Sequence, residues 1–72
     1  MKSLYRKNIA RRLTELRETN KKKQEEVAVS IGMKRPAYAA YEEGRAEPSI
    51  VTLRNICRLY KITVDSFLEG ID

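Results

Sequence analysis

The chain has 72 residues, of which 15 are Lys or Arg and 10 are Asp or Glu, so its formal net charge at pH 7 is +5. A chain this short buries only about 60% of its unfolded surface, which allows one small domain over residues 1–72 but no roomy catalytic pocket. Without His and with a single Cys, it lacks the residues for a zinc site, a disulfide or a His-activated nucleophile. We therefore expect no enzyme activity, no metal and no cofactor.

Positive charge is concentrated in the first third of the sequence. Residues 1–23 hold nine basic and two acidic side chains and carry +7, whereas residues 24–72 carry −2. A basic stretch of this kind is typical of a nucleic-acid-binding protein, although a solvated helix face or attraction to anionic lipid also accounts for it. No apolar run is long enough for a membrane span or a signal peptide, so we expect a cytoplasmic protein without membrane contact.

The first predicted helix covers residues 3–19. Apolar side chains recur there at spacings of three and four with charged residues between them, which is the period of an amphipathic helix. The residues on this stripe are Leu4 or Tyr5, Ile9, Leu13 and Leu16. A second, shorter helix is predicted to begin near Gln24 and to end at Gly32, with Val27, Ala28 and Ile31 on its apolar face.

The third predicted helix follows after a short turn. Because proline disfavours helical geometry in the residue before it and suits the first helical position, we expect Arg35 to be the N-cap and Pro36 the first helical residue. Gly44 is expected just beyond the end of this helix, where a left-handed backbone favours glycine. Tyr38 and Tyr41 share one side of the helix, and we interpret them as core residues rather than as platforms for base stacking.

Two further helices are predicted in the last third of the chain. Ser49 is expected to cap the fourth helix, which ends near Lys61, and Thr63 to cap the fifth, which ends before Gly70. Their apolar stripes are Ile50, Leu53, Ile56, Cys57 and Tyr60, and then Val64, Phe67 and Leu68. No strand, repeat or linker is indicated, so the sequence predicts one all-α domain of five short helices.

Residues 24–43 carry the most informative pattern. The second and third helices are separated by only a few residues and must cross steeply, which requires a small residue at their contact and a permissive residue in the turn. Ala28 and Gly32 supply these, and the residues expected to face the contact are Val27, Ile31, Met33, Tyr38 and Tyr41. Together with YEEGRAEPS at 41–49 and ITVDSFL at 62–68, they make the chain resemble the phage repressor and Cro-like (XRE) helix-turn-helix family over residues 9–68.

The resemblance implies a compact five-helix fold like that of the lambda repressor. It also implies a structural ion pair between Arg17, near the end of the first helix, and Glu42, near the end of the third. Such a partly buried pair would join the two helices. Glu42 and Glu43 are adjacent carboxylates, but neighbours on a helix point about 100° apart, so we do not interpret them as an acid-base pair.

For DNA contact the resemblance implies two kinds of role. Gln24 opens the second helix, where backbone N–H groups and the helix dipole favour an anion, and it matches the family's phosphate anchor. The positions that match major-groove contacts in the third helix are Lys34, Arg35, Pro36, Ala37 and Ala40. Arg35 is the candidate for direct readout, because a guanidinium can donate two hydrogen bonds to guanine O6 and N7. Gly44 and Arg45 are expected to meet backbone phosphate just beyond this helix.

One stretch departs from the family pattern. Where the family usually has a Leu-Ser or Leu-Thr pair before Gln24, this chain has Lys22 and Lys23, so a core residue and an N-cap are both missing. We expect Asn20 to take over the cap, and the lysines to lie near the anchored phosphate and add nonspecific attraction. Few base-reading donors remain on the third helix, so specificity would also depend on DNA shape and a second half-site.

The sequence therefore predicts a sequence-specific DNA-binding transcriptional regulator, expected to be a repressor that binds an inverted-repeat operator in double-stranded DNA as a homodimer. Two alternatives from other classes stay open: an antitoxin that binds a partner protein, and a protein-interaction module that keeps the fold without binding DNA. A neighbouring gene for a small toxin would distinguish the first alternative. The basic first helix and Arg35 argue against the second.

Overall fold

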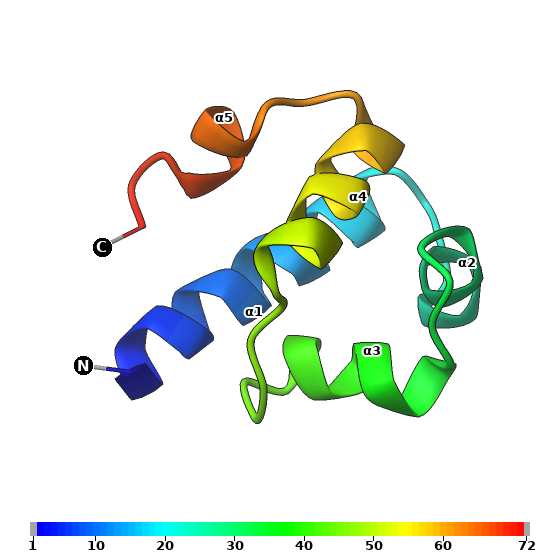
Figure 1. The fold of residues 1–72 in the computed structure, drawn as a ribbon, viewed down its shortest axis with the longest axis horizontal. Helices are drawn as coiled ribbons and strands as arrows, with labels where there is room; N and C mark the ends of the chain where they lie inside the picture. The colour runs from blue at the N-terminus through cyan, green and yellow to red at the C-terminus, as the bar shows by residue number, and fades with distance from the viewer. Residues whose placement is uncertain (1, 72) are drawn as a thin grey trace.

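The computed structural model describes residues 2–71 and contains five helices within that range. They are α1 (Lys2–Thr19), α2 (Gln24–Ser30), α3 (Arg35–Glu42), α4 (Ile50–Tyr60) and α5 (Val64–Leu68). No strand occurs among these residues, so the predicted all-α architecture is confirmed. In Figure 1, α4 crosses in front of the long α1, α2 and α3 lie together on one side, and α5 lies near the other end.

The core forms where the apolar stripes of the helices meet around α1. Its main cluster joins α1, α4 and α5 through Ile9, Leu13, Leu53, Ile56, Cys57 and Phe67. Tyr5 packs against this cluster, whereas Leu4 is exposed, which settles the choice between the two at the start of the stripe. Cys57 is buried and has no disulfide partner, as its place on the apolar side of α4 indicates.

Three helix ends follow the predicted chemistry. Ser49 Oγ accepts a hydrogen bond from the Thr52 N–H at 3.2 Å, and Thr63 Oγ1 accepts one from the Ser66 N–H at 2.9 Å. Both side chains therefore satisfy a backbone donor that the first turn of α4 or α5 leaves unpaired. Gly44 lies one residue beyond the C-cap of α3 with φ of +75°, a conformation in which any side chain would be strained.

Two predicted helix caps are wrong. The N-cap of α3 is Lys34 rather than Arg35, because the Lys34 carbonyl already accepts the Tyr38 N–H at 3.2 Å. Pro36 is thus the second helical residue, where its missing N–H still costs no hydrogen bond. Asn20 does not cap α2, since its side-chain amide donates back to the Leu16 carbonyl at the end of α1. Lys23 is the N-cap of α2 instead.

The start of α2 is stabilised by half of a capping box. The Glu26 carboxylate accepts a hydrogen bond from the Lys23 backbone N–H at 2.7 Å. The reciprocal bond cannot form, because a lysine side chain has no acceptor atom. The missing N-cap noted in the sequence is therefore only partly compensated.

Arg12 joins α5 to α1 in a way that the sequence pattern did not indicate. Its guanidinium donates to the carbonyl oxygens of Ser66, Phe67 and Glu69, at 3.0 to 3.3 Å. These groups lie at the end of α5, where carbonyls lack helical partners and a cation is favoured.

None of the helices within residues 2–71 has both the length and the apolar character needed to cross a bilayer.

Candidate nucleic-acid interface

The helix pair α2–α3 is packed tightly enough to present one rigid outer surface. Ala28 is fully buried at the contact with Val27 and Tyr38, and the turn is closed by a 2.8 Å bond from the Met33 N–H to the Ala28 carbonyl. Gly32 takes a left-handed φ of +74° in this turn. The small residue and the permissive residue thus occupy the places that a steep helix crossing requires.

The expected major-groove residues lie on the side of α3 that faces away from the core. Tyr38 and Ala39 are buried on the inner side of the helix. Lys34, Arg35, Pro36 and Ala37 are exposed, and Ala40 is partly exposed. No acidic residue occurs in the first turn of α3, and neither Lys34 nor Arg35 forms an ion pair within residues 2–71. The outer face of α3 therefore begins with two cations available to an anionic partner.

The ion pair between Arg17 and Glu42 is present and lies at the junction of α1 and α3. Arg17 Nε donates to Glu42 Oε2 at 2.7 Å and Nη2 to Oε1 at 3.0 Å, which is the bidentate geometry of a strong pair. The side chain of Glu42 is only 5% exposed and that of Arg17 is 17% exposed. Arg17 also donates to the Lys22 carbonyl at 3.1 Å, so it fixes the turn between α1 and α2 as well.

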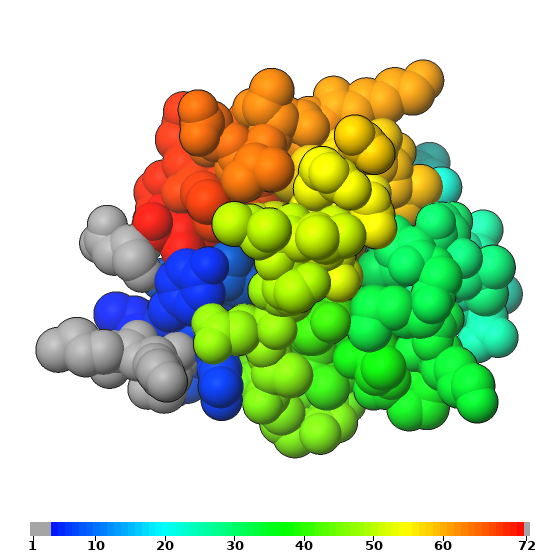
Figure 2. Space-filling model, in the orientation of Figure 1, coloured from blue at the N-terminus to red at the C-terminus, as the bar shows by residue number. Residues whose placement is uncertain are grey.

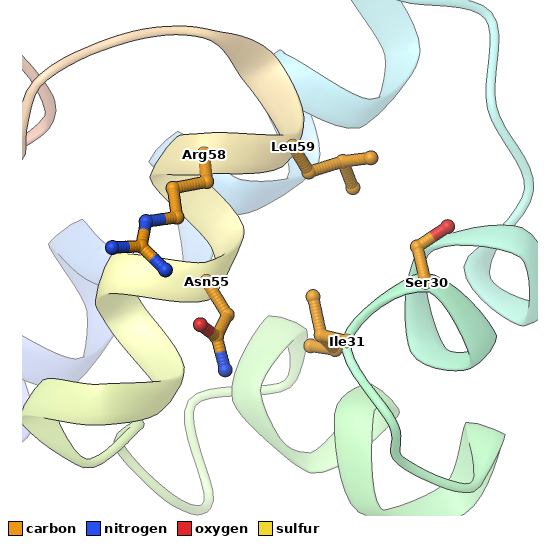
Figure 3. A pocket seen from close by; sticks show the side chains of 5 residues that line it. All are labelled: Ser30, Ile31, Asn55, Arg58 and Leu59. Carbon is orange, nitrogen blue, oxygen red and sulfur yellow. The ribbon is translucent and has the colours of Figure 1, made fainter.

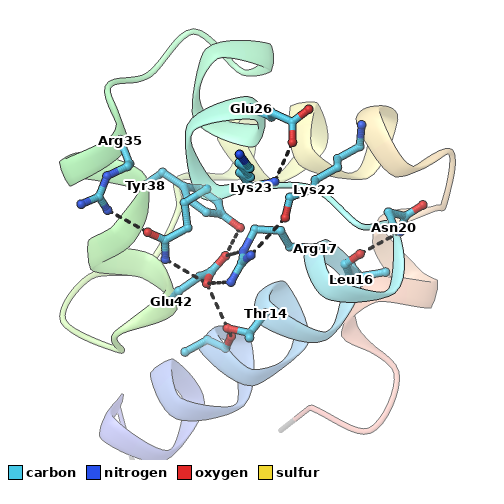
Figure 4. Close-up of polar contacts among 12 residues, drawn as sticks. Thr14, Leu16, Arg17, Asn20, Lys22, Lys23, Glu26, Arg35, Tyr38 and Glu42 are labelled. Carbon is cyan, nitrogen blue, oxygen red and sulfur yellow. Dashed lines mark hydrogen bonds and ion pairs between the residues drawn. The ribbon is translucent and has the colours of Figure 1, made fainter.

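Glu42 is the hub of a hydrogen-bond network, because it accepts hydrogen bonds from side chains of three helices (Figure 4). Besides Arg17, it accepts hydrogen bonds from Thr14 Oγ1 at 3.2 Å, from Gln24 Nε2 at 3.1 Å and from the Tyr38 hydroxyl. Both carboxylate oxygens are therefore satisfied although the group is largely buried. A buried carboxylate is tolerated only under this condition.

These hydrogen bonds also determine the protonation state of the Glu42 carboxyl group. Burial by itself would raise the pKa of Glu42, but hydrogen bonds from Arg17, Tyr38 and Gln24 stabilise the carboxylate and leave its pKa below the ordinary value. The same bond to Glu42 raises the pKa of Arg17. Burial, and then the bond to Glu42, raises the pKa of Tyr38, which stays protonated and can donate. The pair is thus fully charged at neutral pH.

A pH-dependent contribution of Glu42 to stability follows from its lowered pKa. Because the folded protein holds the carboxylate deprotonated more strongly than the unfolded chain does, this contribution is present above pH 4.5, the ordinary pKa, and is lost as pH falls through the lower folded value. We expect the stability difference between wild type and Glu42→Gln to be constant from about pH 7 to 5.5 and to shrink at lower pH. Urea denaturation at a series of pH values measures it, and a difference that does not change down to about pH 2.5 would contradict the assignment.

Gln24 connects the hub to the outer face. Its side-chain oxygen accepts a hydrogen bond from Arg35 Nη1 at 2.9 Å, while its amide nitrogen donates to Glu42. The expected phosphate anchor and the expected base-reading residue are therefore in direct contact before any ligand binds. Gln24 keeps one further amide hydrogen with which it could donate outward.

The residues beyond α3 are partly engaged within the protein. The backbone N–H of Gly44 donates to the Tyr41 carbonyl at 3.2 Å, and that of Arg45 donates to the Ala40 carbonyl at 3.0 Å. Neither amide is free to bind a phosphate oxygen. The Arg45 side chain is exposed, and its Nε lies 2.7 Å from a carboxylate oxygen of Glu43. Ion pairs at such exposed positions contribute little to stability. The exposed Arg45 guanidinium, rather than these amides, can supply a charged contact here.

A shallow hollow of about 450 Å³ opens between the end of α2 and the middle of α4 (Figure 3). It is lined by Ser30, Ile31, Asn55, Arg58 and Leu59. No carboxylate or thiol lies among these side chains to serve as a base or a nucleophile. Groups of His, Cys, Asp and Glu able to hold a metal are also absent from the described part of the chain.

Comparison with known proteins agrees with this geometry. Residues 8–67 match the profile of a family described as the helix-turn-helix domain. A protein of Bacillus subtilis (strain 168), named as the uncharacterized HTH-type transcriptional regulator YqaE, is 40% identical over 58 residues, covering 81% of this chain and 50% of that protein. The HTH-type transcriptional regulator DdrOP3 of Deinococcus deserti is 33% identical over 64 residues, covering 89% of this chain and 50% of that protein.

The chain belongs to the helix-turn-helix domain family. The family resemblance inferred from the sequence is thereby confirmed, and the chain spans about half the length of both relatives. Within this helix-turn-helix domain, sequence reasoning missed Thr14 and the hydroxyl of Tyr38 as donors to Glu42. Thr14 lies one turn before Arg17 on the same side of α1, a spacing that could have indicated a shared partner.

Proposed function

We propose that this domain binds double-stranded DNA with α3 in the major groove and regulates transcription. The observation that carries the proposal is the outer face of α3, which starts with the exposed cations Lys34 and Arg35 and is supported from behind by the packed α2. The net charge of +7 on residues 1–23 adds long-range attraction to a polyanion. An exposed helix held rigid by its neighbour is the element that base readout requires.

The proposed contacts divide into positioning and reading groups. Gln24, Arg45 and the lysines at 21–23 bind phosphate oxygens and fix the orientation of the domain on the duplex. Arg35 reads a guanine, and Ala37 and Ala40 allow only apolar contact, for example with a thymine methyl group. Lys34 and Pro36 border the groove. Because few side chains on this face can donate hydrogen bonds to bases, the remaining specificity comes from DNA shape and from a second half-site.

A second copy of the chain would supply that half-site. Ile50 and Val51, at the start of α4, are 82% and 52% exposed, so two adjacent apolar residues lie on the surface here. Figure 2 shows the segment around residue 50 at the centre of one face. An apolar patch can pair with its own copy across a two-fold axis. We therefore propose a homodimer that occupies an inverted-repeat operator and represses by blocking the promoter.

Selection from random DNA duplexes tests this function and identifies the operator. We expect Arg35→Ala to lose about 1 to 3 kcal/mol on the selected duplex and little on unrelated DNA, because a base contact is lost. Lys23→Gln should instead weaken binding to every duplex by a similar factor and lower the salt slope by about one unit, because a phosphate contact is lost. Affinities for selected and scrambled duplexes at several salt concentrations separate the two cases.

Equal weakening of both duplexes by Arg35→Ala would show that Arg35 binds phosphate rather than a base. Failure of the wild-type protein to enrich any sequence would contradict sequence-specific binding altogether. Lys23 and Arg35 are both exposed, so the melting temperatures of the two variants should match that of the wild type. This comparison is the control for folding.

A further inference from the structure

We propose that Glu43 limits the affinity of the domain for DNA, because its carboxylate competes with a backbone phosphate for the guanidinium of Arg45. This inference rests on the proposed function, in which Arg45 is a phosphate contact. Arg45 Nε donates to Glu43 Oε1 at 2.7 Å, and the two side chains are 65% and 54% exposed. The guanidinium is therefore accessible to DNA while it already holds an anion.

The turn after α3 brings these two side chains together. Glu43 is the C-cap of α3 with a helical backbone, and Gly44 follows with a left-handed φ of +75°. The backbone N–H groups of Gly44, Arg45 and Ala46 donate to carbonyls of α3 at 3.0 to 3.3 Å and hold the turn in this shape. Because the backbone fixes the positions of residues 43 and 45, the carboxylate stays close to the guanidinium when DNA approaches.

Other cations on the expected DNA-binding side have no such competitor. Within residues 2–71, no ion pair involves the lysines at 21–23, Lys34 or Arg35. Next to the turn after α3, by contrast, Arg6 also faces a carboxylate, because its Nη2 lies 3.8 Å from Glu47 Oε1. Positive charge is thus unpaired where α2 and α3 begin, and paired where α3 ends.

The pair implies an exchange of partners when DNA binds. To contact a phosphate, Arg45 must give up its bond to Glu43, so the loss of the old contact offsets part of the gain from the new one. The effect is modest, because exposed ion pairs are weak and are screened by salt. It concerns a phosphate contact, which carries no sequence information. Glu43 therefore lowers the affinity for DNA of any sequence and leaves discrimination between sequences unchanged.

Glu43→Gln tests the competition, because glutamine keeps the length of the side chain and removes its charge. We expect the variant to bind the selected and the scrambled duplex about two- to fivefold more tightly than the wild type at low salt, with a smaller gain at higher salt. The matched control is Glu69→Gln, which removes an exposed carboxylate at the end of α5, away from α3 in Figure 1. It should leave both affinities nearly unchanged.

Arg45→Ala separates competition from simple repulsion between Glu43 and the duplex. When Arg45 is already alanine, Glu43→Gln should no longer raise the affinity, because the two substitutions act on one contact. A gain of the same size in both backgrounds would overturn the proposal, since Glu43 would then act on DNA without Arg45. Unchanged affinities in Glu43→Gln would also overturn it and leave the proposed function intact. If the wild type binds neither duplex, the proposed function fails and this inference fails with it.

Discussion

Arg17→Ala is expected to lower the free energy of unfolding by about 3 to 5 kcal/mol, the range for breaking a buried ion pair from one side. The substitution leaves Glu42 with a side chain only 5% exposed and without its charged partner. It also removes the bond to the Lys22 carbonyl. Because small domains have about 0.05 to 0.15 kcal/mol of stability per residue, this loss is a large part of the total.

Thermal and urea denaturation of the wild type and the variant measure the effect. The matched control is Arg45→Ala, which breaks an ion pair of equal length, 2.7 Å, that lies in solvent. It should change the stability by less than about 1 kcal/mol. If the two substitutions lowered the free energy of unfolding equally, burial would not strengthen the Arg17–Glu42 pair. The pair would then stabilise the contact between α1 and α3 no more than an exposed pair does.

Local chemistry explains which features of the fold the sequence predicts well. The caps by Ser49 and Thr63 depend only on bonds to residues three positions further on, and the structure contains both. The cap assigned to Arg35 failed because proline is tolerated at the second helical position as well as the first. The cap assigned to Asn20 failed because the end of α1, four residues earlier, offered its amide an acceptor.

Most of the contacts that the sequence did not predict join distant segments, and the bond from the Tyr38 hydroxyl to Glu42 within α3 is an exception. Arg12 reaches carbonyl oxygens of residues 66, 67 and 69, more than fifty positions away, and nothing in a helical period indicates such a partner. In the candidate site, the Arg17–Glu42 pair followed from the family resemblance. The bonds from Gln24 to Glu42 and from Arg35 to Gln24 did not, because they depend on how α2 and α3 pack. The residue types predicted which side chains lie at the candidate surface. The hydrogen bonds among those side chains depend on how α2 packs against α3.

Inserting about half a turn of DNA between the two half-sites of the selected operator is expected to reduce affinity by more than about a hundredfold. In a two-fold dimer the two copies of α3 enter the major groove about 34 Å, or roughly 10 to 10.5 bp, apart. The insertion turns one half-site to the far side of the duplex, so one domain loses its base contacts. A full-turn insertion keeps both half-sites on the same side and serves as the control for spacing alone.

Ile50→Asp connects this result to the proposed dimer surface. The side chain is 82% exposed in the single domain, so the substitution should leave folding intact while placing like charges opposite each other across the two-fold axis. We expect the variant to bind the unmodified operator about as weakly as the wild type binds the half-turn duplex, and to be insensitive to spacing. Titrations of both proteins on the three duplexes measure this. Wild-type affinity that is the same on all three would show that the domains bind as independent monomers.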